Sequence, residues 1–101
     1  MKKTKKANTF QDYLKTKLRN KTFKEAYEHY GHALEIGIQV RELRKKAGLT
    51  QIELAKKLGV SQQVLSRLES GEADNPTVAT LERIAQATGH RMRLEFEPAG
   101  T

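Results

Sequence analysis

The sequence predicts an all-α protein, and three observations support this. Apolar residues recur at helical spacing over most of the 101 residues. Polar capping residues precede the helical stretches, and glycines follow them. A single stretch near the C-terminus alternates with the period of two that is typical of a strand. Since a chain of this length has room for one compact domain and little more, we divide it into an extension (1–35), a domain (36–89) and a C-terminal segment (90–101).

The extension is expected to hold a lysine-rich tail and two amphipathic helices. Residues 1–8 are predicted to be disordered. The apolar face of the first helix comprises Phe10, Tyr13, Leu14 and Leu18. The second helix follows a capping box formed by Thr22 and Glu25, and its apolar face comprises Phe23, Ala26, Tyr27, Tyr30 and Leu34. Gly31 and Gly37 leave two interpretations open: one long helix with a weak centre, or two helices that meet between these glycines.

The domain has sharper helix boundaries. Gly48 ends its first helix, and a capping box of Thr50 and Glu53 opens the second. Ser61 caps the third helix and Thr77 caps the fourth. Each helix presents an apolar face, formed in turn by Ile36, Val40, Leu43 and Ala47, by Leu54, Ala55 and Leu58, by Leu65 and Leu68, and by Val78, Leu81, Ile84 and Ala85.

The C-terminal segment is predicted to be a strand. Its apolar residues Met92, Leu94 and Phe96 alternate with Arg91, Arg93, Glu95 and Glu97. A lone strand cannot satisfy its own backbone hydrogen-bonding groups, so it needs a partner. The same strand of a second copy is the most economical partner, and we therefore expect a homodimer that pairs through this segment.

Charge and composition exclude several classes of protein. Residues 1–24 hold nine of the 19 lysines and arginines beside one acid, Asp12, whereas the other residues hold ten basic and eleven acidic side chains. The domain is thus nearly neutral, and any prediction of nucleic-acid binding has to come from its motif. Without cysteine the chain has no disulfides, and without a long apolar run it has no membrane span. We expect a soluble cytoplasmic protein that needs no cofactor or metal.

The motif lies between residues 50 and 71. A helix of about eight residues, a glycine turn at Gly59 and a second helix that begins on a serine are typical of the helix-turn-helix unit. The first residues of the second helix contact base edges in the DNA major groove in such units. We expect base contacts from Gln62, Gln63, Val64, Ser66 and Arg67, and backbone contacts from Thr50, Gln51, Ser61 and Ser70. For Arg67, a phosphate or a neighbouring acid is the alternative partner.

The stretch from Gly48 to Gly71, GLTQIELAKKLGVSQQVLSRLESG, resembles the Cro/C1-type (XRE family) domain of lambdoid phage repressors. The resemblance covers Ile36 to Gly89, about half of the chain. It implies a five-helix lambda-repressor-like domain, base contacts from Gln62, Gln63 and Arg67, and a backbone contact from Gln51. It also implies a structural ion pair between Arg44 and Glu69.

The flanks resemble a narrower group, the HigA-like antitoxins of type II toxin–antitoxin modules. The resemblance rests on FQDYL and TFKEAY before the domain and on HRMRLEFEP after it. It implies a repressor of its own operon whose extension binds and blocks a RelE/HigB-like ribonuclease toxin. The residues expected to bind the toxin are Phe10, Tyr13, Leu14, Leu18, Phe23, Tyr27 and Tyr30.

Several alternatives remain open. The aromatic residues of the extension are either a partner surface or part of its own core. The lysines at positions 2–6 are either a solvated tail or an arm that contacts the DNA backbone. A stand-alone repressor without a toxin is the alternative function. An enzyme is not expected, because the sequence shows no nucleophile–base constellation and no phosphate-binding glycine loop.

Overall fold

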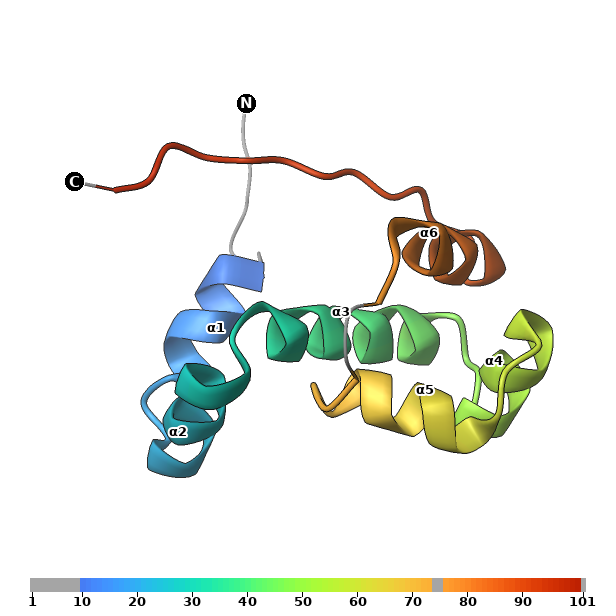
Figure 1. Ribbon diagram of the computed structural model, residues 1–101, viewed down its shortest axis with the longest axis horizontal. Helices are drawn as coiled ribbons and strands as arrows, with labels where there is room; N and C mark the ends of the chain where they lie inside the picture. Colours follow the sequence, from blue (N-terminus) through green and yellow to red (C-terminus); the bar gives the residue numbers. More distant parts are fainter. Residues whose placement is uncertain (1–9, 74–75, 101) are drawn as a thin grey trace.

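Figure 1 shows the computed structural model of the chain, which describes residues 10–73 and 76–100. Within these ranges the chain is all-α, as predicted. Its helices are α1 (Phe10–Lys17), α2 (Lys21–Tyr30), α3 (His32–Lys46), α4 (Gln51–Leu58), α5 (Gln62–Glu69) and α6 (Val78–Ala87). The tail predicted to be disordered, residues 1–8, lies outside the described residues.

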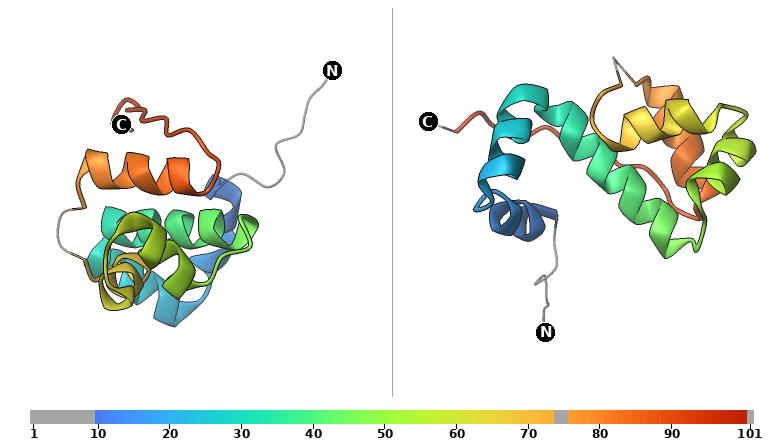
Figure 2. Two further views of the ribbon diagram at one scale, coloured as in Figure 1. Left: turned by 90° about the vertical axis from the view of Figure 1, so that its right-hand side faces the viewer. Right: turned by 90° about the horizontal axis from the view of Figure 1, so that it is seen from below.

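The longest helix, α3, runs through the centre of the molecule. Helices α1 and α2 lie at its N-terminal end and α4 lies beyond its C-terminal end, while α5 and α6 flank it on opposite sides (Figures 1 and 2). The buried core draws on four of these helices: Val40 from α3, Leu54, Ala55 and Leu58 from α4, Leu65 and Leu68 from α5, and Ile84 from α6. Most of the apolar residues expected from the sequence therefore converge on one core that holds α4 and α5 in place, whereas Ala47 and Val78 of the expected faces are exposed.

Gly37 determines how closely α5 approaches α3. A Cβ atom at this position would lie 2.4 Å from the Leu68 carbonyl oxygen and 2.7 Å from that of Glu69. Only a glycine leaves room for the C-terminal turn of α5 to pack against α3 at this distance. Gly37 lies inside α3 and does not interrupt it.

The break in the second half of the extension is at Gly31. Its φ of 60° and ψ of −129° lie outside the helical region, and the residue is both the C-cap of α2 and the N-cap of α3. Since an L side chain rarely adopts such a φ, glycine is the residue that allows the turn. The sequence left open one long helix or two helices that meet between Gly31 and Gly37, and the structure has two separate helices, α2 and α3.

The predicted caps within the domain are confirmed. Thr50 and Glu53 form the reciprocal capping box of α4, Ser61 accepts from Val64 N at 3.1 Å, and Thr77 accepts from Thr80 N at 3.1 Å. The prediction of a capping box at Thr22 and Glu25 is wrong. Asn20 caps α2 instead, since its backbone is extended and its side chain accepts from Phe23 N at 2.9 Å.

The number of helices in the domain also differs from the expectation. Within residues 36–73 and 76–89 the structure has four helices, α3 to α6, where the resemblance implied five. Each of the four corresponds to one apolar face read from the sequence. Because α3 begins at His32, the extension and the domain share this helix.

The predicted strand at Arg91–Glu97 is not found in the structure. Residues 90–100 have no regular secondary structure and pass over α3 on the side of α6 (Figure 1). The physical reason is that a strand needs a second strand to satisfy its N–H and C=O groups, and the described part of this single chain offers none. Leu94 and Phe96 are accordingly 65% and 92% exposed.

Candidate DNA interface

Helices α4 and α5 form a helix-turn-helix unit. Gly59 adopts the left-handed conformation, with φ 73° and ψ 28°, and the next residue, Val60, donates from its N–H to Ala55 O at 3.0 Å. Ala55 itself is 3% exposed, so its small side chain lies in the contact between the two helices. The turn therefore fixes the first residues of α5 next to the N-terminal half of α4.

The outer face of α5 carries the residues predicted to contact bases. Gln62, Gln63 and Arg67 are exposed, Val64 is 53% exposed, and Ser66 is half-buried. On the opposite face Leu65 is fully buried in the core. The guanidinium of Arg67 donates from Nη2 to Glu72 O at 3.3 Å, a neutral carbonyl partner that leaves its other N–H groups for DNA.

A chain of hydrogen bonds links this face to the interior. Arg44 donates from Nε to Glu69 Oε2 at 2.7 Å and from Nη2 to Glu69 Oε1 at 3.0 Å. Gln51 donates from Nε2 to the same Oε1 at 3.0 Å, and Gln62 donates from Nε2 to Gln51 Oε1 at 2.9 Å. The Arg44–Glu69 ion pair implied by the resemblance is thus confirmed. The hydrogen bonds that continue from Glu69 through Gln51 to Gln62, a predicted base-contacting residue, were not predicted from the sequence.

The Arg44–Glu69 ion pair, from which these hydrogen bonds start, is largely removed from solvent. The Glu69 side chain is 3% exposed and that of Arg44 is 12% exposed. Hydrogen bonding to Glu69 raises the pKa of Arg44, and the attraction between the charges adds to this, while burial opposes it. The guanidinium also donates from Nη1 to Leu49 O at 3.0 Å. Glu69 is consequently held in one place and gives Gln51 a fixed anchor.

The geometry at Gln62 suits a bidentate contact to a base. An amide nitrogen carries two N–H groups, and only one of them is needed for Gln51. The second N–H and the amide oxygen remain for the N7 and N6 positions of adenine in the major groove. Because Gln51 already fixes the amide plane, less rotamer freedom is lost when DNA binds.

The four residues predicted to contact the DNA backbone lie in two places. Thr50 and Ser61 are exposed N-caps of α4 and α5, and their hydroxyl groups still have a proton to donate to a phosphate. Gln51 follows Thr50 directly. Ser70 lies at the other end of α5, where its hydroxyl donates to Arg67 O at 3.0 Å. The structure thus brings Thr50, Gln51 and Ser61 near Gln62 and leaves Ser70 apart.

The residues predicted to bind a toxin are covered to different degrees. Leu14 is buried at 6% exposure, and Tyr30 is 38% exposed. The half-buried members are Tyr13, Leu18, Phe23 and Tyr27. The side chain of Phe10 lies outside the described part of the structure. The extension therefore has a small core of its own, and its aromatic residues are only partly covered by it.

Contacts within the extension hold α2 against α1 and α3. The rings of Phe23 and Tyr27 stack with centroids 6.4 Å apart, and Lys17 Nζ lies 5.8 Å from the ring centroid of Tyr13 and 5.9 Å from that of Phe23. The Tyr27 hydroxyl donates to Glu35 of α3. This hydrogen bond raises the pKa of Tyr27, with smaller contributions in the same direction from burial and from the carboxylate charge.

Neither a metal site nor a membrane span is found in the described part of the chain. In residues 10–73 and 76–100, no three His, Cys, Asp or Glu side chains gather into a group that could hold a metal ion. None of the helices described there combines the length and the apolar character needed to cross a membrane.

The fold and the exposed face of α5 define a DNA-binding protein of the helix-turn-helix class. The chain belongs to the helix-turn-helix family, whose model matches residues 40–91. An HTH-type transcriptional regulator of Sinorhizobium fredii, y4dJ, is 50% identical over 54 residues, which are 54% of this chain and 69% of that protein. The chain is therefore a sequence-specific DNA-binding regulator, and not an enzyme.

Two further relatives extend the comparison. Antitoxin HigA1 of Mycobacterium tuberculosis is 37% identical over 76 residues, which are 75% of this chain and 50% of the antitoxin. The regulator SinR of Bacillus subtilis is 36% identical over 50 residues, which are 50% of this chain and 45% of SinR. The chain thus spans about half the length of these two relatives. No solved structure is significantly similar to the chain.

Proposed function

We propose that the chain is an antitoxin of the HigA type. In this proposal α5 recognises the operator of the chain's own operon, and the extension binds and blocks a RelE/HigB-like ribonuclease toxin. A pair of copies would place two recognition helices about one DNA turn (~34 Å) apart on a pseudo-palindromic operator. Gln62, Gln63 and Arg67 are the proposed base-contacting residues, with Val64 and Ser66 beside them, and Thr50, Gln51, Ser61 and Ser70 contact the backbone.

The observation that carries the antitoxin proposal is the reach of the similarity to HigA1. The match to HigA1 covers 76 residues, whereas the helix-turn-helix family model covers residues 40–91. A match of that length necessarily includes residues outside the DNA-binding domain. The matches to y4dJ and SinR, at 54 and 50 residues, are no longer than such a domain requires.

The packing of α2 supports a protein partner for the extension. None of its residues is buried, although Phe23, Ala26 and Tyr27 form one apolar face that continues to Tyr30. Partly covered aromatic side chains are typical of surfaces that a partner protein covers. Since the proposed contact face of α2 consists of aromatic and other apolar side chains, we expect apolar contacts to hold the complex together.

Separating the two activities by mutation tests the proposal. The chain is co-expressed with the product of the adjacent gene, and growth rescue and co-purification are scored. DNA binding is measured in parallel on the fragment upstream of the chain's own gene. We expect the Phe23→Ala/Tyr30→Ala double variant to lose rescue but retain DNA binding, and Gln62→Ala/Arg67→Ala to do the reverse.

A matched control is available on the same helix. Glu28 is an exposed residue of α2 outside the apolar face, and Glu28→Ala should leave both activities unchanged. If the adjacent gene product is not toxic and forms no complex while the upstream DNA is still bound, the chain is a stand-alone repressor. That outcome would overturn the antitoxin proposal and keep the DNA-binding one.

A further inference from the structure

We propose that two copies of the chain pair through residues 91–97 as an antiparallel two-stranded ribbon whose two-fold axis passes through Leu94. The proposal rests on the proposed function in one respect, because an operator with two half-sites needs two copies. It goes further by assigning the partner surface, the strand direction and the register.

The C-terminal segment is left without a strand partner in the single chain. Residues 90–100 run in an extended course over α3 (Figure 1) and pair with no other strand within the described residues. Leu94 is 65% exposed and Phe96 is 92% exposed, so the chain itself does not cover this apolar surface. Extended backbone with uncovered apolar side chains is the kind of edge that pairs with another strand.

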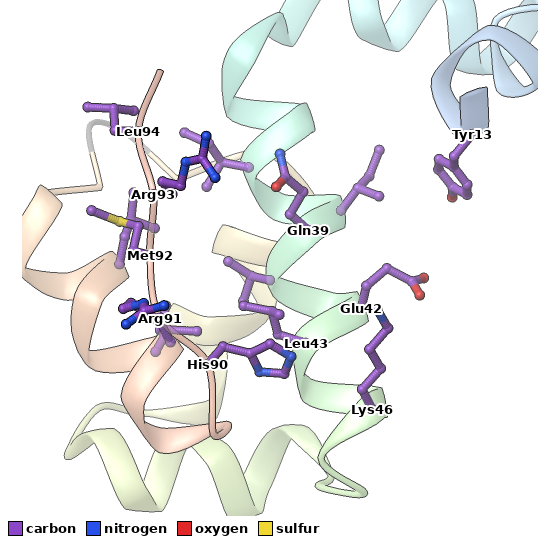
Figure 3. A pocket seen from close by; sticks show the side chains of 16 residues that line it. Tyr13, Gln39, Glu42, Leu43, Lys46, His90, Arg91, Met92, Arg93 and Leu94 are labelled. Carbon is purple, nitrogen blue, oxygen red and sulfur yellow. The ribbon is translucent and has the colours of Figure 1, made fainter. Parts of the chain in front are cut away.

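The segment already has two distinct faces. Arg93 and Glu95 form an ion pair with each other, which places both side chains on one side of the segment. Figure 3 shows Arg93 on the side of the segment that faces Gln39 of α3, and Met92 and Leu94 on the other side. Side chains that alternate in this way follow the period of a strand.

Charge complementarity between two copies selects one register. When Leu94 of one copy lies opposite Leu94 of the other, Arg93 faces Glu95 and Arg91 faces Glu97 across the two strands. The apolar face then pairs Met92 with Phe96. All four charge pairs of the ribbon are attractive, and every apolar residue lies opposite another apolar residue.

Neighbouring registers are less favourable. An axis through Arg93 places two arginines opposite each other, and an axis through Glu95 places two glutamates opposite each other; like charges in this position are destabilising. An axis between two residues places apolar side chains opposite charged ones. A parallel pair in register places each charged residue beside its own copy. Pro98 has no N–H to donate and marks the end of the ladder.

The surroundings of the segment suit a second copy. A groove of about 490 Å³ lies between α3, α6 and the first residues of the segment, and apolar side chains of Ile36, Leu43 and Leu81 line it together with Met92 and Leu94. The apolar face of the ribbon is continuous with this groove. Pairing would therefore cover Leu94 and Phe96 next to these apolar side chains, while charged and polar residues such as Gln39 and Glu42 form the rest of the groove.

Single cysteines test the register directly, because the chain contains no cysteine of its own. Residues directly opposite in an antiparallel pair have Cβ atoms about 5 Å apart, whereas diagonal neighbours lie about 7–8 Å apart, beyond easy disulfide reach. Under mild oxidation we expect Leu94→Cys to form a covalent dimer. Arg93→Cys and Glu95→Cys should stay monomeric on a non-reducing gel when each is alone and cross-link when they are mixed.

Two outcomes would overturn the proposal. Cross-linking of Arg93→Cys or Glu95→Cys alone as fast as Leu94→Cys would place the axis elsewhere. The absence of any cross-link, together with a monomeric mass by light scattering, would exclude the ribbon. DNA binding by the same unoxidised proteins is measured separately, so operator recognition without cross-linking would reject the ribbon and leave the proposed function standing.

Discussion

Gln51 has a different role in the structure from the one expected of it. The sequence predicted a contact to the DNA backbone, whereas the structure shows its side chain shared between Glu69 in the interior and Gln62 on the outer face of α5. The two roles are compatible, because an amide retains a free N–H and a free lone pair after two hydrogen bonds. Gln62, a predicted base-contacting residue, is thereby oriented through Gln51 by a buried ion pair that it does not itself contact.

Arg67 is the residue whose role is easiest to test. We expect Arg67→Ala to weaken operator binding by about 1–3 kcal/mol and to relax the preference at a single base position, because Arg pairs bidentately with guanine. The measurement is a set of dissociation constants on operators that carry each single base change. Equal weakening on every operator sequence would instead make Arg67 a backbone contact. The exposed Lys57 of α4 provides the comparison, because Lys57→Ala should weaken binding equally on every sequence if that lysine contacts a phosphate.

For single residues, the sequence predicted which residues form the site better than it predicted which of them contact one another. The exposed residues of α5 and the Arg44–Glu69 pair were found from the motif and the resemblance. The link from Gln62 through Gln51 to Glu69 was not, because the three residues are 11 and 18 positions apart and join only when α4 and α5 have packed. The assigned contacts to DNA and to a toxin remain predictions.

Among the elements, α2 shows how local signals compete. Asn20 and Thr22 are both good capping residues, and a glutamate follows Thr22 at the spacing of a capping box. The backbone turns at Asn20, so its side chain caps the helix and Thr22 lies inside it. Helices α4, α5 and α6 were predicted more closely, because each combines a capping residue, an apolar face and a glycine after its end. The strand was not found, because strand pairing is not local.

The packing of α2 on α3 should depend on pH at the alkaline end. The pKa of Tyr27 is raised in the folded state, so the neutral phenol that donates to Glu35 is favoured by folding. The stability from this contact is fully present below the ordinary tyrosine pKa of about 10 and is lost as the pH rises through the raised value. We expect an absorbance titration to show Tyr27 ionising only above the ordinary tyrosine pKa.

The control for this prediction is Tyr27→Phe, which keeps the ring that stacks on Phe23 but removes the hydroxyl. The late component of the titration should disappear in this variant, and melting temperatures of the two proteins should converge at alkaline pH. A wild-type titration without a component above the ordinary tyrosine pKa would show that the contact to Glu35 is not maintained in solution.

For the whole molecule, the uneven distribution of charge has a measurable effect. The basic excess lies in residues 1–24, while the part that carries α3 to α6 is close to neutral. If the lysines at positions 2–6 contact phosphates, removing residues 1–6 should flatten the slope of log K against log salt by about 0.9 for each phosphate that these lysines neutralise. Replacing these lysines by glutamine at constant length is the control, and it should have the same effect. An unchanged slope would make these lysines a solvated tail.

The uninterrupted course of α3 from His32 to Lys46 has a consequence for how such proteins can evolve. Domains joined by a loose linker can be exchanged by recombination within that linker, and insertions there are tolerated. In this chain a single inserted residue near the middle of α3 would rotate everything upstream by about 100° around the helix axis. It would also move Gly37 away from α5. The extension and the helix-turn-helix unit are therefore expected to be inherited together, as a unit whose junction does not accept a change of length.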